Sequence, residues 1–288
     1  MTAMLLLGVA ALAWGASWPA MKIVVSQMPI YSFRVLTAWG GGAMVLLIAW
    51  LMGNSLRLAR RDIGPALVAG LLNITGWLYF TALGLTMLPA GRATVLAYTM
   101  PLWAFLAAIL LTGERITARR LIALGFGLGA VLVLGGDDLI RLGAAPLGVL
   151  ATLAAAASWG LGTVVQKKTV WRTPLLTVAG WQLLLGGAPL AALAIAQDSA
   201  PFANITMQGA LAMAYIVLIG TVLGYWAWFR VLQLIPGEMA ALGILPVPVI
   251  GVISSTLILG EPLGWAEFAA VALLTAALAT MLYRGTRP

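Results

Sequence analysis

The chain has 288 residues, of which 62% are hydrophobic and only 8% are charged, and its mean hydropathy is +1.05. Soluble globular domains are about 25% charged, so this composition excludes a water-soluble fold and predicts a membrane protein. The net charge of +8 is expected on cytoplasmic loops, and nucleic-acid binding is excluded because no basic cluster is interleaved with aromatic residues in a polar segment.

Apolar segments long enough to cross a bilayer follow one another along almost the whole chain. A spanning helix needs about 20 apolar residues, and breaks at charges and at proline or glycine clusters separate about ten such segments. The first segment lacks a basic start and is long for a signal peptide, so we expect it to remain as a membrane helix. The predicted bounds are 3–24, 29–53, 62–87, 90–112, 117–136, 146–169, 173–197, 206–233, 237–260 and 263–284.

Basic residues concentrate between alternate segments, and this pattern predicts the orientation. Those expected on one face are Arg57, Arg60, Arg61, Arg115, Arg119, Arg120, Lys167, Lys168, Arg172, Arg284 and Arg287. The opposite face holds fewer, namely Lys22, Arg34, Arg92 and Arg141, together with Asp137, Asp138 and Asp198. The face richer in basic residues is expected to be cytoplasmic. We therefore predict a multi-pass protein of a bacterial-type inner membrane with both termini in the cytoplasm.

Matching landmarks indicate an internal repeat. Three pairs are 147 residues apart, namely Pro89 with Pro236, Pro101 with Pro248, and Gly113-Glu114 with Gly260-Glu261. Three further pairs are 145 residues apart, namely Trp14-Gly15 with Trp159-Gly160, Lys22 with Lys167, and Gly41-Gly42 with Gly186-Gly187. Each half then holds five segments, and an odd number inserts the second half from the opposite side. The sequence predicts an all-α membrane fold of ten helices in two inverted five-helix repeats, 1–142 and 143–288.

Four stretches of sequence carry a family resemblance. They are WGASWPAMK in the first segment, SFR opening the second, PLWAFLAAILLTGERIT across the fourth and ILPVPVIGVISSTLILGEPL across the ninth. Through them the chain resembles the drug/metabolite transporter superfamily, its EamA-domain members and, within those, the YddG-type amino-acid exporters. The resemblance covers essentially the whole chain and implies two inverted five-helix bundles around a central cavity. Because such proteins export many different metabolites, it does not fix the substrate.

Prolines within the segments offer backbone groups to a solute. Proline has no N–H, so the carbonyl four residues before it loses its helical donor. Freed carbonyls accept from an ammonium group, and the N-terminal ends of broken half-helices attract a carboxylate. A zwitterion is thereby bound without a charged side chain, although kinking for packing alone explains the prolines equally well. The pairs are Ala97 with Pro101, Leu242 with Pro246 and Ile244 with Pro248.

Polar and aromatic side chains deep in the segments are candidates for lining a cavity. A buried asparagine is costly in lipid unless it is paired, so Asn73 is expected to face the interior, either toward solute or as a contact between helices. Deep tryptophans can stack on flat apolar solutes and donate one hydrogen bond, while core packing is the alternative for any single aromatic residue. The candidate substrate-binding residues are Trp14, Ser17, Asn73, Trp77, Tyr79, Tyr98, Pro101, Trp103, Trp159, Thr163, Tyr225 and Pro248.

The chain offers little for catalysis or metal binding. It contains no cysteine and no histidine, and its eight acidic residues lie at or near the predicted segment ends. We therefore expect no catalytic residues, no metal, no cofactor and no proton coupling through a buried carboxylate, with Glu238 just inside the ninth segment as the one exception to consider. Lys22 and Lys167 are expected to extend toward opposite membrane surfaces, and a gating role is the alternative.

The sequence thus predicts a secondary transporter and not an enzyme. Its expected cargo is a small zwitterionic metabolite, most simply an amino acid with an aromatic or apolar side chain, exported by alternating access and with a monomer sufficient for function. Efflux of lipophilic drugs or other metabolites is the alternative within the same class. An integral membrane enzyme would need an acid–base or metal constellation near one interface, and a scaffold would have no use for paired broken helices.

Overall fold

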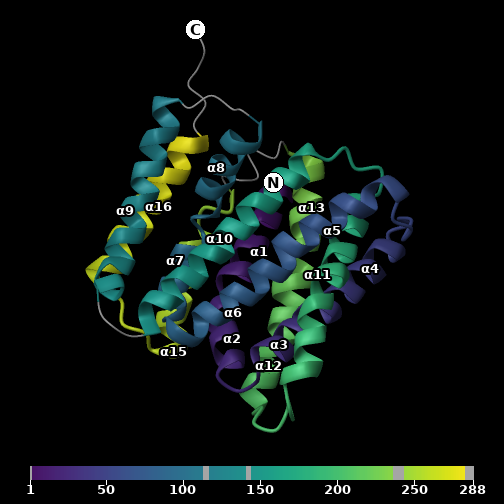
Figure 1. Ribbon diagram of the computed structural model, residues 1–288, viewed down its shortest axis with the longest axis horizontal. Coiled ribbons are helices and arrows are strands. Elements are labelled where there is room, and N and C mark those ends of the chain that lie inside the picture. The colour runs from purple at the N-terminus through teal and green to yellow at the C-terminus, as the bar shows by residue number, and fades with distance from the viewer. Residues whose placement is uncertain (1, 113–116, 141–143, 236–242, 283–288) are drawn as a thin grey trace.

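The computed structural model describes residues 2–112, 117–140, 144–235 and 243–282. These residues form helices joined by short connections, and no strand occurs among them, which confirms the predicted all-α class. Figure 1 shows the helices packed alongside one another, with α9 and α16 paired at one side of the molecule. Residues that entered the predictions but lie outside the described ranges are Gly113, Glu114, Arg115, Arg141, Pro236, Glu238, Leu242, Arg284 and Arg287.

The helical elements follow the apolar segments. In the first half they are α1 (Thr2–Gly15), α2 (Ser17–Val25), α3 (Ile30–Val35), η1 (Leu36–Gly40), α4 (Gly41–Leu51), η2 (Arg60–Asp62), α5 (Ile63–Gly70), η3 (Leu71–Gly76), α6 (Trp77–Met87), α7 (Ala90–Ala97), α8 (Met100–Thr112) and α9 (Ala118–Ile140). In the second half they are α10 (Ala144–Lys168), α11 (Leu175–Gln197), α12 (Met207–Tyr215), η4 (Ile216–Leu223), α13 (Gly224–Leu234), α15 (Val247–Leu259) and α16 (Trp265–Leu282).

Seven helical stretches of the described residues are long and apolar enough to cross a membrane. They are Thr2–Val25, Ile30–Leu51, Arg60–Met87, Ala90–Leu110, Pro146–Lys168, Leu175–Gln197 and Met207–Leu234. The three other segments expected from the sequence coincide with shorter apolar helices, namely Leu121–Leu134, Val247–Leu259 and Trp265–Thr280. The observed helices therefore agree with the predicted segments in position, while seven of them reach full spanning length.

The outer surface is apolar, as a bilayer requires. Leu110, Ile195 and Leu257 are 83%, 87% and 79% exposed, and such exposure of large aliphatic side chains is favourable only against lipid or another apolar partner. Inside the bundle, small residues dominate the contacts. Ala66 and Ala155, for example, are fully buried, because small side chains let helix backbones approach closely where no water drives association.

Three helices contain a wide turn with the i→i+5 bonding of a π-helix. These turns are η1, η3 and η4, and π-type turns inside α-helices are frequent at functional sites. The first residues of η3 and η4, Leu71 and Ile216, are 145 positions apart (216 − 71 = 145). This spacing equals the offset of the Trp14 and Trp159 pair in the sequence.

Both proline-bearing segments are interrupted where the sequence predicted. α7 ends at Ala97, Tyr98 and Thr99 form a turn, and α8 begins at Met100. The turn closes through Leu102 N, which donates to Thr99 O at 2.9 Å. In the second half, residues 244–246 form a turn and α15 begins at Val247. The two interrupted segments meet through α7 and α15, so both breaks lie within the bundle.

Candidate binding site within the helix bundle

Helix α10 carries Trp159 and Thr163 and contacts three further candidates, Asn73, Trp77 and Trp103. Gly160 lies against α8 so closely that a β-carbon built on it would be 2.6 Å from Ala104 N and 2.8 Å from Trp103 Cβ. α10 also packs along α6 and η3. The absence of a side chain at Gly160 therefore lets α8 approach α10 closely.

Three indoles form the centre of the site, and we name Trp18, Trp77 and Trp159 the tryptophan cluster. The ring centroids of Trp77 and Trp159 are 5.0 Å apart at an interplanar angle of 57°. Those of Trp18 and Trp77 are 6.4 Å apart at 82°, an edge-on arrangement. Trp18 is buried, while Trp77 and Trp159 are half-buried. Such tilted and edge-on pairs are favoured by the aromatic quadrupole, and the three rings form an apolar cluster without charge.

Asn73 joins this site from η3, one turn before Trp77. It is 5% exposed, and its Oδ1 has no hydrogen-bond partner. The side-chain amide lies against Gly162 of α10, which leaves room for it by having no side chain. Thr163 is also on α10, but its hydroxyl donates to Trp159 O at 2.9 Å. The unsatisfied Asn73 oxygen is therefore the open acceptor among these residues, since a buried polar atom without a partner is uncommon.

Trp14 and Ser17 form a separate contact with η4. Trp14 Nε1 donates to Gly220 O at 3.0 Å, and its ring lies 5.8 Å from that of Trp228. Ser17 Oγ donates to Ala13 O at 2.6 Å and lies beside Gly220 as well. Both donors are thus engaged by the protein, and these two residues fix α1 and α2 against η4 in this state.

The rings of Tyr79 and Tyr225 contact other aromatic rings than those of the tryptophan cluster, although Trp77 packs against the same hydrophobic cluster as both tyrosines. Tyr79 stacks on Tyr31 with centroids 5.8 Å apart and an interplanar angle of 2°. Tyr225 lies 6.3 Å from Phe229. Both tyrosines pack against one hydrophobic cluster of α4, α6, α11 and η4. The structure therefore places them in side-chain packing between helices.

The candidate residues at the two helix breaks differ in how deeply they are buried. Tyr98 is 7% exposed within the main core, Pro101 is half-buried and Pro248 is buried. One predicted acceptor is contradicted, because Ile244 O accepts from Val247 N at 3.1 Å and is not free. The turn before α15 supplies the donor that Pro248 lacks, which explains the correction.

The twelve sequence candidates leave out Trp18, Thr81 and Arg34, although helical spacing puts Trp18 on a face with Trp14 and Thr81 on a face with Trp77. Trp18 completes the tryptophan cluster, and Thr81 lies one turn after Trp77 on α6. The charge pattern predicts Arg34 at one membrane face, yet it is 1% exposed. Its position five residues inside the predicted segment 29–53 was the available signal, since a charge within an apolar helix is costly unless it has a use.

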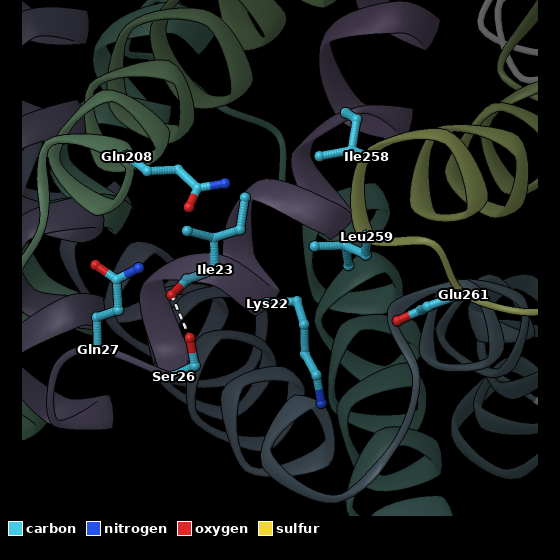
Figure 2. Close-up of a pocket in the computed structure, with 8 residues that line it drawn as sticks. All are labelled: Lys22, Ile23, Ser26, Gln27, Gln208, Ile258, Leu259 and Glu261. Carbon is cyan, nitrogen blue, oxygen red and sulfur yellow. Dashed lines mark hydrogen bonds between the residues drawn. The ribbon is translucent and has the colours of Figure 1, made fainter.

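A cavity of about 440 Å³ lies apart from these residues, at the ends of α2, α12 and α15. Figure 2 shows its lining, which includes Lys22, Gln27, Gln208 and Glu261 and none of the twelve sequence candidates. Gln27 Oε1 accepts from Thr206 N at 3.0 Å and from Thr206 Oγ1 at 2.9 Å. The cavity thus lies at one end of the bundle. Most of the residues that line it are polar, and Ile258 and Leu259 of α15 form an aliphatic border.

Two charged residues beside this cavity bind the turn between α6 and α7. Lys22 Nζ donates to Leu85 O at 2.5 Å and to Leu88 O at 2.8 Å. Glu261 Oε1 accepts from Ala90 N at 2.6 Å, and Oε2 accepts from Gly91 N at 2.9 Å. A cation thus lies at the C-terminus of α6 and an anion at the N-terminus of α7, as both helix dipoles favour. Lys22 is half-buried at this end of the bundle, and its ammonium group is bonded to the end of α6.

The position of Glu261 depends on the glycine before it. Gly260 has φ of +67° and ends α15, with its N–H donating to Thr256 O at 3.0 Å. This left-handed conformation is readily adopted only by glycine and turns the chain sharply at the helix end. Glu261 is thereby directed at the first turn of α7, which explains the Gly-Glu pair noted in the sequence.

Replacing Glu261 with glutamine is expected to destabilise the turn between α6 and α7. One amide oxygen cannot accept both N–H groups in the same way, and the charge at the helix N-terminus is lost. Hydrogen bonds to charged groups contribute about 1.5–3 kcal/mol, so thermal unfolding in detergent should occur at a lower temperature. Glu261→Asp keeps the charge on a shorter side chain, and its unfolding temperature should lie between those of the wild type and Glu261→Gln. Unfolding of Glu261→Gln at the wild-type temperature would contradict this role.

Comparisons with known proteins agree with this architecture. The model of the EamA-like transporter family matches residues 1–136 and 146–283. The uncharacterized transporter YoaV of Bacillus subtilis (strain 168) is 26% identical over 87% of this chain and 86% of its own. A protein of Escherichia coli (strain K12) named as a probable amino-acid metabolite efflux pump is 28% identical over 66% of this chain and 67% of its own.

A solved structure shows the same fold. It is described only as a crystal structure of a protein and has a TM-score of 0.69 at 24% identity, covering 97% of this chain and 96% of its own. The apolar helical bundle and these matches define a multi-pass membrane transport protein. The chain belongs to the EamA-like transporter family, since the family model matches both halves of it.

Proposed function

We propose that the protein exports small zwitterionic metabolites, most simply amino acids with aromatic or apolar side chains, by alternating access. The observation that carries this proposal is the uncharged tryptophan cluster, in which α2, α6 and α10 meet beside two interrupted helices. Indole surfaces suit apolar and aromatic side chains. The printed name of the E. coli relative, a probable amino-acid metabolite efflux pump, supports the same cargo class.

The proposed architecture is ten helices in two inverted repeats, 1–142 and 143–288. Its support lies in paired contacts: α10 packs on α6 as α1 packs on α13, and α10 packs on α8 as α1 packs on α15. The wide turns η3 and η4 and the two helix breaks also occur at matching positions. The proposed boundary falls between the two segments that the family model matches. Inverted repeats of this kind rock about a shared site.

The proposed orientation places both termini in the cytoplasm of a bacterial inner membrane. It is supported by hydrogen bonds between connecting segments, which join basic connections to one another and the remaining connections to one another. Asp62 Oδ2 accepts from Thr173 N at 2.8 Å, joining the two connections that are rich in basic residues. Asp198 Oδ2 accepts from Ser32 N at 2.7 Å, joining two connections of the other set. Basic connections face the cytoplasm in membrane proteins. A single copy contains the whole proposed site, so a monomer is sufficient.

The direct test uses purified protein in liposomes preloaded with labelled amino acids. Efflux of at least one aromatic or aliphatic amino acid is expected to exceed efflux from protein-free vesicles. If no amino acid leaves faster than from those vesicles, the substrate proposal fails. The half-buried indoles of the cluster would also suit a lipophilic cation or dye, so unlabelled dye is added as a competitor. Inhibition of the labelled efflux by the dye, without inhibition by unlabelled amino acids, would favour drug efflux.

Export is expected to continue when the proton gradient is collapsed. The described carboxylates at the ends of helices are engaged by protein donors: Asp62 by Thr173, Asp198 by Ser32, Glu261 by the first turn of α7, and Glu267 by Arg92 at 3.0 Å. A proton-coupled carrier would need an ionisable group on the solute path. Efflux rates with and without a proton ionophore should agree within about twofold, and a tenfold decrease would show coupling.

A further inference from the structure

Arg34 is a buried cation held only by neutral groups. It lies in α3 and is 1% exposed. Its Nη2 donates to Thr81 Oγ1 at 2.9 Å, and Nη1 lies 3.3 Å from Met21 Sδ. The guanidinium carbon is 4.1 Å from the centroid of the Phe33 ring, and Nε has no hydrogen-bond partner. A guanidinium has five N–H donors, so these contacts leave part of its donor capacity unused.

No carboxylate lies within ion-pair distance of Arg34 among the residues that the structure describes. Asp198, which lies near α3, accepts from Ser32 N and Ser32 Oγ instead. An unpaired charge inside a membrane protein is expensive, and intramembrane arginines usually mark a ligand path or an ion pair. The arrangement is therefore incomplete without an anion that comes from elsewhere.

Arg34 is also next to the tryptophan cluster. Thr81 Oγ1, which accepts from Arg34, donates to Trp77 O at 2.6 Å. Met21 follows Trp18 by three residues on α2. The two residues that contact the guanidinium, Thr81 and Met21, therefore each lie about one helical turn from a tryptophan of the cluster along their own helix. A molecule with a carboxylate at one end and an apolar group at the other would reach both.

We infer that Arg34 binds the carboxylate of the exported solute while the tryptophan cluster contacts its apolar side chain. This inference rests on the proposed function and names the charged group that its substrate must carry. Thr81 and Met21 hold the guanidinium in the absence of solute, and the carboxylate replaces these weak partners with charge-assisted hydrogen bonds. Arginine is suited to this exchange because its planar fork matches the two carboxylate oxygens.

The experiment combines variants with modified competitors in the liposome assay, using the labelled amino acid that the wild-type protein exports fastest. For phenylalanine the competitors are 3-phenylpropionate, which lacks the ammonium group, 2-phenylethylamine, which lacks the carboxylate, and the methyl ester. Arg34→Gln should export phenylalanine roughly tenfold to a hundredfold more slowly. Inhibition by 3-phenylpropionate should be lost in this variant, while 2-phenylethylamine should compete equally with both proteins.

Two further proteins make the result specific. Arg230→Gln removes an exposed arginine that donates to Gln233 Oε1 at 2.8 Å, and it should export as the wild type does. Arg34→Lys keeps the charge without the fork and should be intermediate. If Arg34→Gln does not purify as a folded protein, the wild-type competitors decide, because the methyl ester must compete at least tenfold more weakly than phenylalanine.

The outcomes separate the two proposals. Wild-type efflux at the rate of protein-free vesicles would overturn the proposed function and this inference with it. Wild-type efflux together with normal export by Arg34→Gln would overturn the inference alone. The inference would also fail if the methyl ester competed as strongly as phenylalanine.

Discussion

Replacing Gly160 with valine is expected to abolish export. A β-carbon at this position would lie 2.6 Å from Ala104 N and 2.9 Å from Met100 O, and backbone atoms of α8 cannot move aside as a flexible side chain could. Overpacking of a well-packed contact typically costs about 1–3 kcal/mol, and valine adds two further methyl groups. We expect a lower unfolding temperature in detergent and efflux at the level of protein-free vesicles, with Gly160→Ala between valine and the wild type.

Gly125→Val is the matched control for this prediction. Gly125 is exposed on α9, and a β-carbon added there would have nothing within 4 Å of it. The same chemical change therefore meets open space, and stability and efflux should remain close to those of the wild type. Equal losses in the two variants would mean that valine harms the helices themselves and not the contact between α8 and α10.

Replacing Trp77 with alanine is expected to change which amino acids are exported. Trp77 touches both other members of the tryptophan cluster, so its removal takes away the central surface of the site. Truncating a buried tryptophan costs up to about 3–5 kcal/mol of stability, and a half-buried one should cost less. Export of aromatic amino acids should fall at least tenfold relative to export of alanine, while Trp77→Phe should retain most of the preference.

The ratio between substrates separates binding from packing. A residue that only supports the fold would slow all substrates together, whereas a residue in contact with solute changes their ratio. Trp265→Ala removes a tryptophan that is 76% exposed at the start of α16, and both rate and ratio should be unchanged. An unchanged ratio in Trp77→Ala would remove the tryptophan cluster from the proposed site.

The apolar segments and the helix breaks could be predicted from the sequence because their causes are local. Runs of apolar residues set helix positions, and Pro101 removes a donor wherever its neighbours lie. Even so, Ile244 O proved to be bonded, because a turn can supply a donor from three residues away. The position of a proline predicts which backbone carbonyl loses its helical donor, whereas the geometry of the folded turn determines whether that carbonyl finds another donor.

The composition of the candidate site was harder to predict because it depends on contacts between distant segments. Trp77 and Trp159 were expected in a cavity wall and do meet, while the rings of Tyr79 and Tyr225 pair with those of Tyr31 and Phe229. The azimuth of a residue on its own helix does not say which neighbouring helix it faces. Arg34 shows the same limit, since its burial is created by Thr81 and Met21 of two other helices.

The wide turns bear on how the two halves arose. A π-type turn arises when one residue is inserted into an α-helix, and η3 and η4 begin at equivalent positions of the two halves. Duplication of one ancestral half would explain the two proposed repeats, and the wide turn shared by both would then have been present before the copying. The turn η1 begins at Leu36, whereas the equivalent position, 181 (36 + 145 = 181), lies within the uninterrupted helix α11. This third wide turn therefore distinguishes the first half from the second, and the two halves are not exact copies of one another.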